Sequence, residues 1–91
     1  MAEQMPGGWS AWSFDITREA QKVFDEALAG LVGVDYSPLA FATQVVAGTN
    51  YCFLCKAKGV YPGAEAYPAL VYIYQPLSGA PHITSITEVK P

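Results

Sequence analysis

Gln44-Val45-Val46-Ala47-Gly48, which runs on into Thr49-Asn50-Tyr51, carries the clearest structural signal in this chain. Apolar, strand-forming residues lie on both sides of it, from Tyr36 to Ala42 and from Tyr51 to Ala57. Two extended runs joined by a connector that contains glycine predict a β-hairpin. Gly48 suits the corner of that hairpin, because glycine adopts a positive φ without a Cβ clash.

The predicted tip of this hairpin is apolar and uncharged, whereas exposed tips normally carry polar residues that water solvates. Two explanations are open. Another part of the chain covers the tip, or the tip enters a narrow cleft on a partner.

A single amphipathic helix is expected before the hairpin. Its apolar residues recur at helical spacing along one face: Ala20, Val23, Phe24, Ala27, Leu28 and Leu31. Asp15 or Thr17 can cap the start of the helix, and Gly30 and Gly33 end it.

Alternation of apolar and polar residues predicts a sheet after the helix. Two further strands follow the hairpin, the first centred on residues 69–74 and the last over His82–Val89, with loops at Lys58–Pro68 and Gln75–Pro81. We expect one face of the hairpin's second strand to meet the helix, because Lys56 and Lys58 on the other face belong in water. The residues of that inner face are Tyr51, Phe53, Cys55 and Ala57, which makes Cys52 the more exposed cysteine. One helix followed by a four-stranded antiparallel meander is an α+β architecture.

Composition indicates one folded domain spanning residues 1–91, with 52% hydrophobic and 14% charged residues. A net charge of −3 argues against nucleic acid as a partner, because phosphate-binding surfaces need clustered Lys and Arg. The longest apolar run, Ala69–Tyr74, is too short to span a bilayer, and the N-terminus lacks a signal-peptide pattern. We therefore expect no membrane partner and a cytoplasmic location.

Cys52 and Cys55 have the spacing of a redox C-x-x-C motif. Such motifs depend on a helix N-terminus or nearby cations, whereas these residues lie in a predicted strand and should point to opposite faces. Ordinary reduced cysteines are the favoured interpretation, and a thiol redox enzyme is the alternative. One C-x-x-C pair and the single His82 offer too few ligands for a zinc site, so we expect no cofactor, no metal and no catalytic residue.

Residues 1–8 end in Met5-Pro6-Gly7-Gly8, which is either a frayed terminus or a flexible arm with an apolar tip beyond a glycine hinge. Trp9 and Trp12 follow as large apolar anchors that fasten the chain where the arm leaves the body.

These features together resemble the cystatin family. Gln44-Val45-Val46-Ala47-Gly48 is similar to its signature Q-x-V-x-G, and residues 44–51 resemble the stefin branch in particular. Gly7-Gly8 stands ahead of the helix as the family's N-terminal glycine does. Gln75-Pro76-Leu77 lies where many cystatins have Pro-Trp and stefins have a loop that contains Leu. Departures from the pattern include Trp9, Trp12, both cysteines and the 58–68 loop.

The resemblance implies a cystatin-like α+β fold, with one N-terminal helix wrapped by a four- to five-stranded antiparallel sheet. It implies reversible inhibition of papain-like cysteine proteases of the cathepsin type, without covalent chemistry, by a protein that is not an enzyme. The arm and two hairpins would form a wedge in the protease cleft, with these binding residues: Met5, Pro6, Gly7, Gly8, Gln44, Val45, Val46, Ala47, Gly48, Pro76, Leu77 and Ser78. The expected state is a monomer, with exchange of an opened hairpin as a route to a domain-swapped dimer. A cystatin-fold binding module without protease inhibition is the alternative function.

Overall fold

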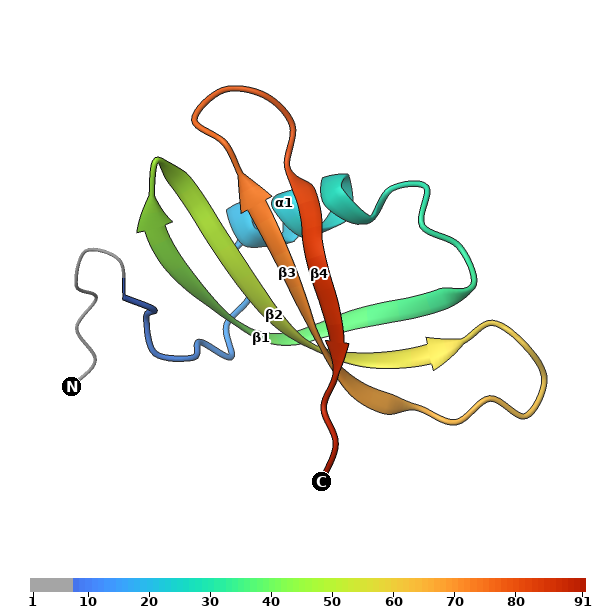
Figure 1. The fold of residues 1–91 in the computed structure, drawn as a ribbon. Helices are drawn as coiled ribbons and strands as arrows, with labels where there is room; N and C mark the ends of the chain where they lie inside the picture. The colour runs from blue at the N-terminus through green and yellow to red at the C-terminus, as the bar shows by residue number, and fades with distance from the viewer. Residues whose placement is uncertain (1–7) are drawn as a thin grey trace.

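The computed structural model describes residues 8–91; Met5, Pro6 and Gly7 of the predicted arm lie outside the described residues. The element order is α1 (Arg18–Leu28), β1 (Val34–Val46), β2 (Gly48–Gly59), β3 (Tyr67–Gln75) and β4 (His82–Glu88). The strands form an antiparallel sheet in the order β1-β2-β3-β4, and α1 lies across one face of it (Figure 1). The predicted α+β arrangement of one helix against a four-stranded antiparallel meander is confirmed.

Helix α1 begins where the sequence places a cap. The Thr17 hydroxyl accepts a hydrogen bond from the Ala20 amide at 3.1 Å, and Glu19 lies in the first turn, where a carboxylate suits the positive helix end. The helix ends at Leu28, and Gly30 follows with φ 87°. Leu31, which the helical spacing includes, lies beyond the helix and is exposed, because the helix stops before the glycine at position 30.

The core lies between α1 and the inner face of the sheet. Phe24 packs edge-on against Phe53 with ring centroids 4.9 Å apart, and Phe53 also stacks with Phe41 and Tyr51. The buried residues of this cluster are Ala20, Val23, Phe24, Tyr51, Phe53, Cys55, Val71 and Ile73. The predicted inner face of β2 is therefore confirmed, and Lys56 and Lys58 are exposed as expected.

The outer face of the sheet is covered near the hairpin end, which the sequence does not reveal. The chain before α1 pairs with β1 through isolated bridges from Trp9 to Gln44 and from Ser13 to Phe41. These bridges place a short fifth strand-like segment at the β1 edge.

The prediction for Cys52 is wrong, because this residue is only 4% exposed. Trp9, Trp12 and Tyr72 lie around it on the outer face, where they line a common pocket with its side chain. As the alternation within β2 predicts, Cys52 lies on the outer face of the sheet. At this position, however, other side chains cover the outer face, so Cys52 is buried.

β1 is irregular at Leu39. The pairing with β2 shifts between Pro38 and Ala40, and Leu39 is exposed at this bulge. Phe41, which follows the bulge, packs on the inner face against Phe53. The bulge therefore interrupts the alternation of faces along β1, since it adds one residue to only one strand of a pair.

Candidate functional site

The tip of the β1–β2 hairpin is tighter than the sequence suggests. Val46 pairs directly with Gly48, so Ala47 alone lies between the two strands. Most of the signature stretch therefore belongs to strands. Gly48 has φ 104°, a left-handed conformation that L side chains rarely adopt.

The second hairpin lies directly beside the first. Because β2 and β3 are antiparallel neighbours, Thr49 pairs with Gln75, and the β1–β2 tip and the β3–β4 loop extend from the same end of the sheet (Figure 1). We call residues 44–48 and 75–79 together the hairpin edge.

Gly48 is the point at which the two hairpins touch. A Cβ atom on this residue would lie 2.5 Å from the Gln75 carbonyl oxygen and 3.1 Å from the Pro76 Cα. Both are backbone atoms of the second hairpin, so no side chain can fit between them without a backbone shift. Gly48 is buried, and the part of the tip that faces solvent is Val45, Val46 and Ala47.

Tyr74 fastens the two hairpins together. Its hydroxyl donates a hydrogen bond to the carbonyl oxygen of Ala47 at the tip. Its ring packs edge-on against His82 across the β3–β4 pair, with centroids 5.7 Å apart. Tyr74 is not among the site residues that the sequence predicts, because only the strand register places its hydroxyl beside the tip.

The second hairpin is also pinned from within. The Gln75 side-chain amide donates to the carbonyl oxygens of Pro76 at 3.1 Å and Gly79 at 2.9 Å. Leu77 extends from this loop with 85% of its surface exposed, and Ser78 beside it is exposed as well. A loop held by hydrogen bonds from the Gln75 side chain thus presents one large apolar side chain to solvent.

The start of the described chain lies against the first hairpin. Gly8 is half-buried, and Trp9 pairs with Gln44 and packs edge-on against Tyr72 with centroids 6.1 Å apart. Gln44 in turn accepts a hydrogen bond from the Asn50 side-chain amide at 2.8 Å. The structure therefore brings together every predicted site residue that it describes, from Gly8 through both hairpins.

Hydrogen bonds extend this attachment along β1. The Ser10 amide donates to the Thr43 carbonyl oxygen at 2.8 Å, and the Thr43 amide donates to the Ser10 hydroxyl at 3.0 Å. Ser13 and Phe41 exchange two further backbone bonds. The segment from Trp9 to Ser13 is thereby fixed along β1, next to the first hairpin.

The two cysteines lie in separate environments. Both are free, and they point to opposite faces of β2, Cys55 into the core and Cys52 toward Trp9 and Tyr72. Burial raises the pKa of the Cys55 thiol to about 12, with a smaller contribution from Cys52. Burial also raises the pKa of Cys52, against the opposing effect of a hydrogen bond with Tyr72. Reactive cysteines need a lowered thiol pKa, so this environment favours the structural interpretation.

Within residues 8–91, no group of three or more His, Cys, Asp or Glu side chains could hold a metal ion. In the same part of the chain, no helix has the length and apolar character that crossing a membrane would need. No model of a known protein family matches the chain, and no curated protein matches it in sequence.

Proposed function

We propose that this protein is a stefin-like member of the cystatin family that inhibits papain-like cysteine proteases reversibly. The observation that carries the proposal is the hairpin edge: two hairpins from distant parts of the chain, held in contact, with exposed apolar residues and no charge. Its exposed large apolar side chains are Val45, Val46 and Leu77.

The physics of such an edge suits a deep and narrow protease cleft. Both hairpins are already joined through Gly48 and Tyr74, so little conformational entropy is lost when they bind. Val46 and Ala47 would enter the centre of the cleft, and Leu77 would contact the leaving-group side. Met5-Pro6, beyond Gly7-Gly8, would occupy the pockets on the acyl side. No scissile bond would be presented to the nucleophile, so the inhibitor would remain intact.

The proposal also places the protein in the cytoplasm. Cys52 and Cys55 are both free thiols, which is the usual state in reducing compartments. A monomer would be the inhibitory form.

The test is inhibition of papain and a cathepsin by the purified protein. We expect inhibition below micromolar concentration. Val46→Asp and Leu77→Asp should each weaken it by at least about tenfold, or about 1.4 kcal/mol, since each places an unpaired carboxylate in an apolar contact. Gly48→Arg is a poorer probe, because Gly48 is buried and its φ is positive, so that substitution also disturbs folding.

Val60→Asp is the matched control. Val60 is an exposed valine in the β2–β3 loop, outside the hairpin edge, and its substitution should leave inhibition unchanged. Absence of inhibition by the wild-type protein at micromolar concentration rules the proposal out.

The alternative is a cystatin-like binding module without protease inhibition. Deletion of Met1–Gly8 separates the two functions. A cleft inhibitor loses affinity for its protease when the arm is removed, whereas a module that binds a partner elsewhere on the sheet keeps its affinity.

A further inference from the structure

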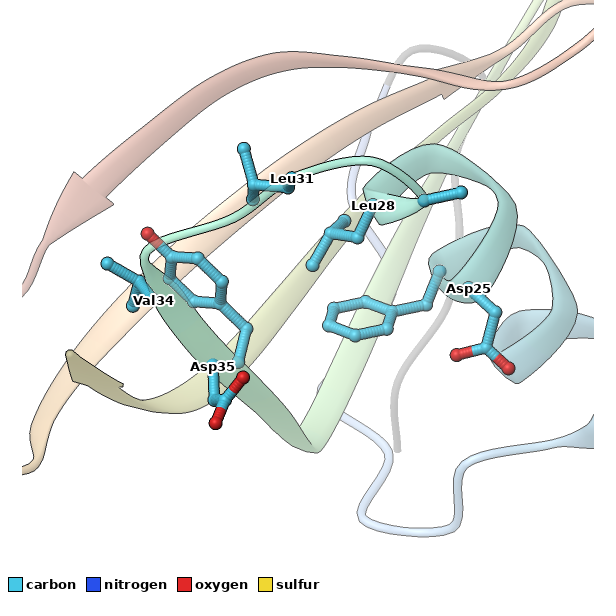
Figure 2. A pocket seen from close by; sticks show the side chains of 8 residues that line it. Asp25, Leu28, Leu31, Val34 and Asp35 are labelled. Atoms are coloured by element: carbon cyan, nitrogen blue, oxygen red, sulfur yellow. The ribbon is translucent and has the colours of Figure 1, made fainter. Parts of the chain in front are cut away.

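An exposed apolar surface lies at the end of the sheet opposite the hairpin edge. It is formed by the α1–β1 loop and the β2–β3 loop, the teal and yellow loops on the right of Figure 1. Four large apolar side chains are exposed there, and we call them the loop-end patch: Leu31, Val32, Val60 and Tyr61. Figure 2 shows Leu31 on the loop beyond α1, with Val34 where β1 begins.

The two loops are joined through their backbones. Val34 pairs with Gly59 at the start of the β1–β2 ladder. One residue further out, the Val60 amide donates a hydrogen bond to the Gly33 carbonyl oxygen at 3.0 Å. The pairing thus continues past the strands and brings the residues before Gly33 beside Val60 and Tyr61. The four side chains therefore belong to one surface.

Tyr61 is held in place, although 67% of its surface is exposed. A Cβ atom on Gly59 would collide with the Tyr61 ring, so the ring lies directly over the Gly59 backbone. The Ala64 amide donates to the Tyr61 carbonyl oxygen at 3.2 Å and closes a turn through Pro62 and Gly63. An ordered ring loses little conformational freedom on binding, and tyrosine is among the residues that contribute most at protein interfaces.

The charges around the patch suit a contact with itself. Residues 29–34 and 59–64 contain no Asp, Glu, Lys or Arg, although the chain carries a net charge of −3. Asp35 and Lys58 are the next residues along β1 and β2, and they pair across the two strands with opposite charges. In a two-fold contact, each residue i that meets residue j is matched by j meeting i. Two copies can therefore meet here without like charges in the centre, and Asp35 of each copy has a complement in Lys58 of the other.

The area of the patch fits a weak contact between two copies. With the exposed Pro62 beside it, the patch leaves roughly 500 Å² in contact with water, within the range of the largest, often functional, patch on a monomer. Pairing two such patches buries about 1,000 Å², which is at the lower limit for a specific interface. This area is too small for a permanent dimer and sufficient for a reversible one.

We propose that the loop-end patch is a self-association surface on which a second copy of this chain docks by a two-fold contact. Val32 and Tyr61 of one copy pack against the same residues of the other. Both hairpin edges stay free at the far ends of the dimer, because the hairpin tip follows Val46 at the other end of β1. The expected Kd is about 100 µM to 1 mM, so the protein is monomeric at the submicromolar concentrations of an inhibition assay.

Sedimentation equilibrium and amide spectra of ¹⁵N-labelled protein test the proposal over a concentration range of about 10 µM to 1 mM. We expect a monomer–dimer equilibrium, with amide shifts that depend on concentration confined to residues 30–35 and 58–65. The dimer should dissociate at once on dilution, whereas a dimer formed by hairpin exchange persists until the chains unfold locally.

Substitutions separate the two apolar surfaces. Val32→Asp and Val60→Asp should each weaken self-association at least about tenfold, because each buries an unpaired carboxylate in the contact. Val46→Asp makes the same change at an exposed valine of the hairpin edge and should leave self-association unaltered. All three valines are exposed, so the variants should fold, which their amide spectra will verify.

A mixing experiment tests the two-fold geometry. Unlabelled Val32→Lys is added to ¹⁵N-labelled Val32→Asp, and the mixture should associate at least about tenfold more tightly than either variant alone, since opposite charges then meet. Three results would overturn the proposal: no association of the wild type at about 1 mM, equal losses in Val32→Asp and Val46→Asp, or no gain on mixing. The last result would mean that the patch binds a different surface of the second copy. None of these outcomes depends on whether the hairpin edge inhibits a protease.

Discussion

Gly48 is the residue on which most of the geometry of the hairpin edge depends. It combines a positive φ with a close approach to the backbone of the second hairpin, and each of these demands glycine for a different reason. The sequence predicts the positive φ, because the corner of a tight hairpin needs it. The close approach to the second hairpin arises only because β3 ends beside Gly48.

Gly48→Ala should therefore destabilise the fold by about 2 kcal/mol or more, through backbone strain and a forced shift at Gln75. For a domain of this size that corresponds to a fall in Tm of about 10 °C. Gly63→Ala is the control, since Gly63 also has a positive φ but would place its Cβ in open space. Its cost should be about 1 kcal/mol. Thermal unfolding of both variants measures the difference, and equal losses would contradict the role of the contact.

The buried thiols and Tyr51 should make the folded protein less stable at alkaline pH. Burial raises the pKa of Tyr51, Cys52 and Cys55, so the folded state keeps protons that the unfolded state releases. At pH values below about 8.5, the pKa of a thiol in the unfolded state, these groups contribute fully to the free energy of unfolding. That contribution declines as the pH rises from there toward about 12, the pKa of Cys55 in the folded state.

Urea unfolding at pH 7 and pH 10 measures this decline. The midpoint should fall at pH 10 in the wild type, and a Cys52→Ala, Cys55→Ala variant should show a smaller fall between the same two pH values. A midpoint that does not change with pH, or the same fall in both proteins, would count against the thiol contribution.

Among the elements, β3 determines how the two hairpins sit together. It pairs with the second strand of the first hairpin and is itself the first strand of the second hairpin. Tyr74 near its end makes the hydrogen bond that joins them. The relative position of the two hairpins is therefore a property of the sheet register.

Tyr74→Phe should weaken the contact between the two hairpins without unfolding the protein. The ring can still pack on His82, so Tm should change by only a few degrees, whereas the Ala47 and Gly48 amide resonances should shift or broaden. On the proposed function, the dissociation rate from papain should rise about five- to tenfold. Tyr72→Phe is the matched control, since Tyr72 faces Trp9 and Cys52 instead of the tip. An unchanged tip spectrum in Tyr74→Phe would show that the bond is not formed in solution.

The short segment before α1 is the second element that positions other parts of the molecule. Its contacts with β1 cover the outer face of the sheet and bury Cys52. It also pairs Trp9 with Gln44, which holds Gly8, the residue before Trp9, near the first hairpin.

For the molecule as a whole, the one-residue tip bears on the oligomeric state. A closed hairpin requires the positive φ of Gly48, whereas in an opened, exchanged hairpin the same residue can be extended. The φ strain of Gly48→Ala falls on the closed monomer and is relieved in the opened hairpin, so this variant should raise the fraction of swapped dimer at high protein concentration. Size-exclusion chromatography after slow concentration measures this fraction. Gly63→Ala should remain at the wild-type level, and an equal dimer fraction in both variants would exclude the tip as the hinge.

The sequence by itself determined the element types, their order and the inner face of the sheet. These follow from local periodicity: the helical spacing of Ala20, Val23 and Phe24, the cap at Thr17 and the alternation along residues 51–57. It also placed all the proposed binding residues near turns or the N-terminus, where glycine and proline mark the chain.

Only the tertiary structure decided which turns meet and which face stays covered. The contact of Gly48 with Gln75, the bond from Tyr74 to Ala47 and the burial of Cys52 all join residues distant in sequence. The periodicity of apolar residues shows only which face of one helix or strand is buried. The contacts named above depend on strand register and on one segment crossing another, and no local sequence pattern encodes these.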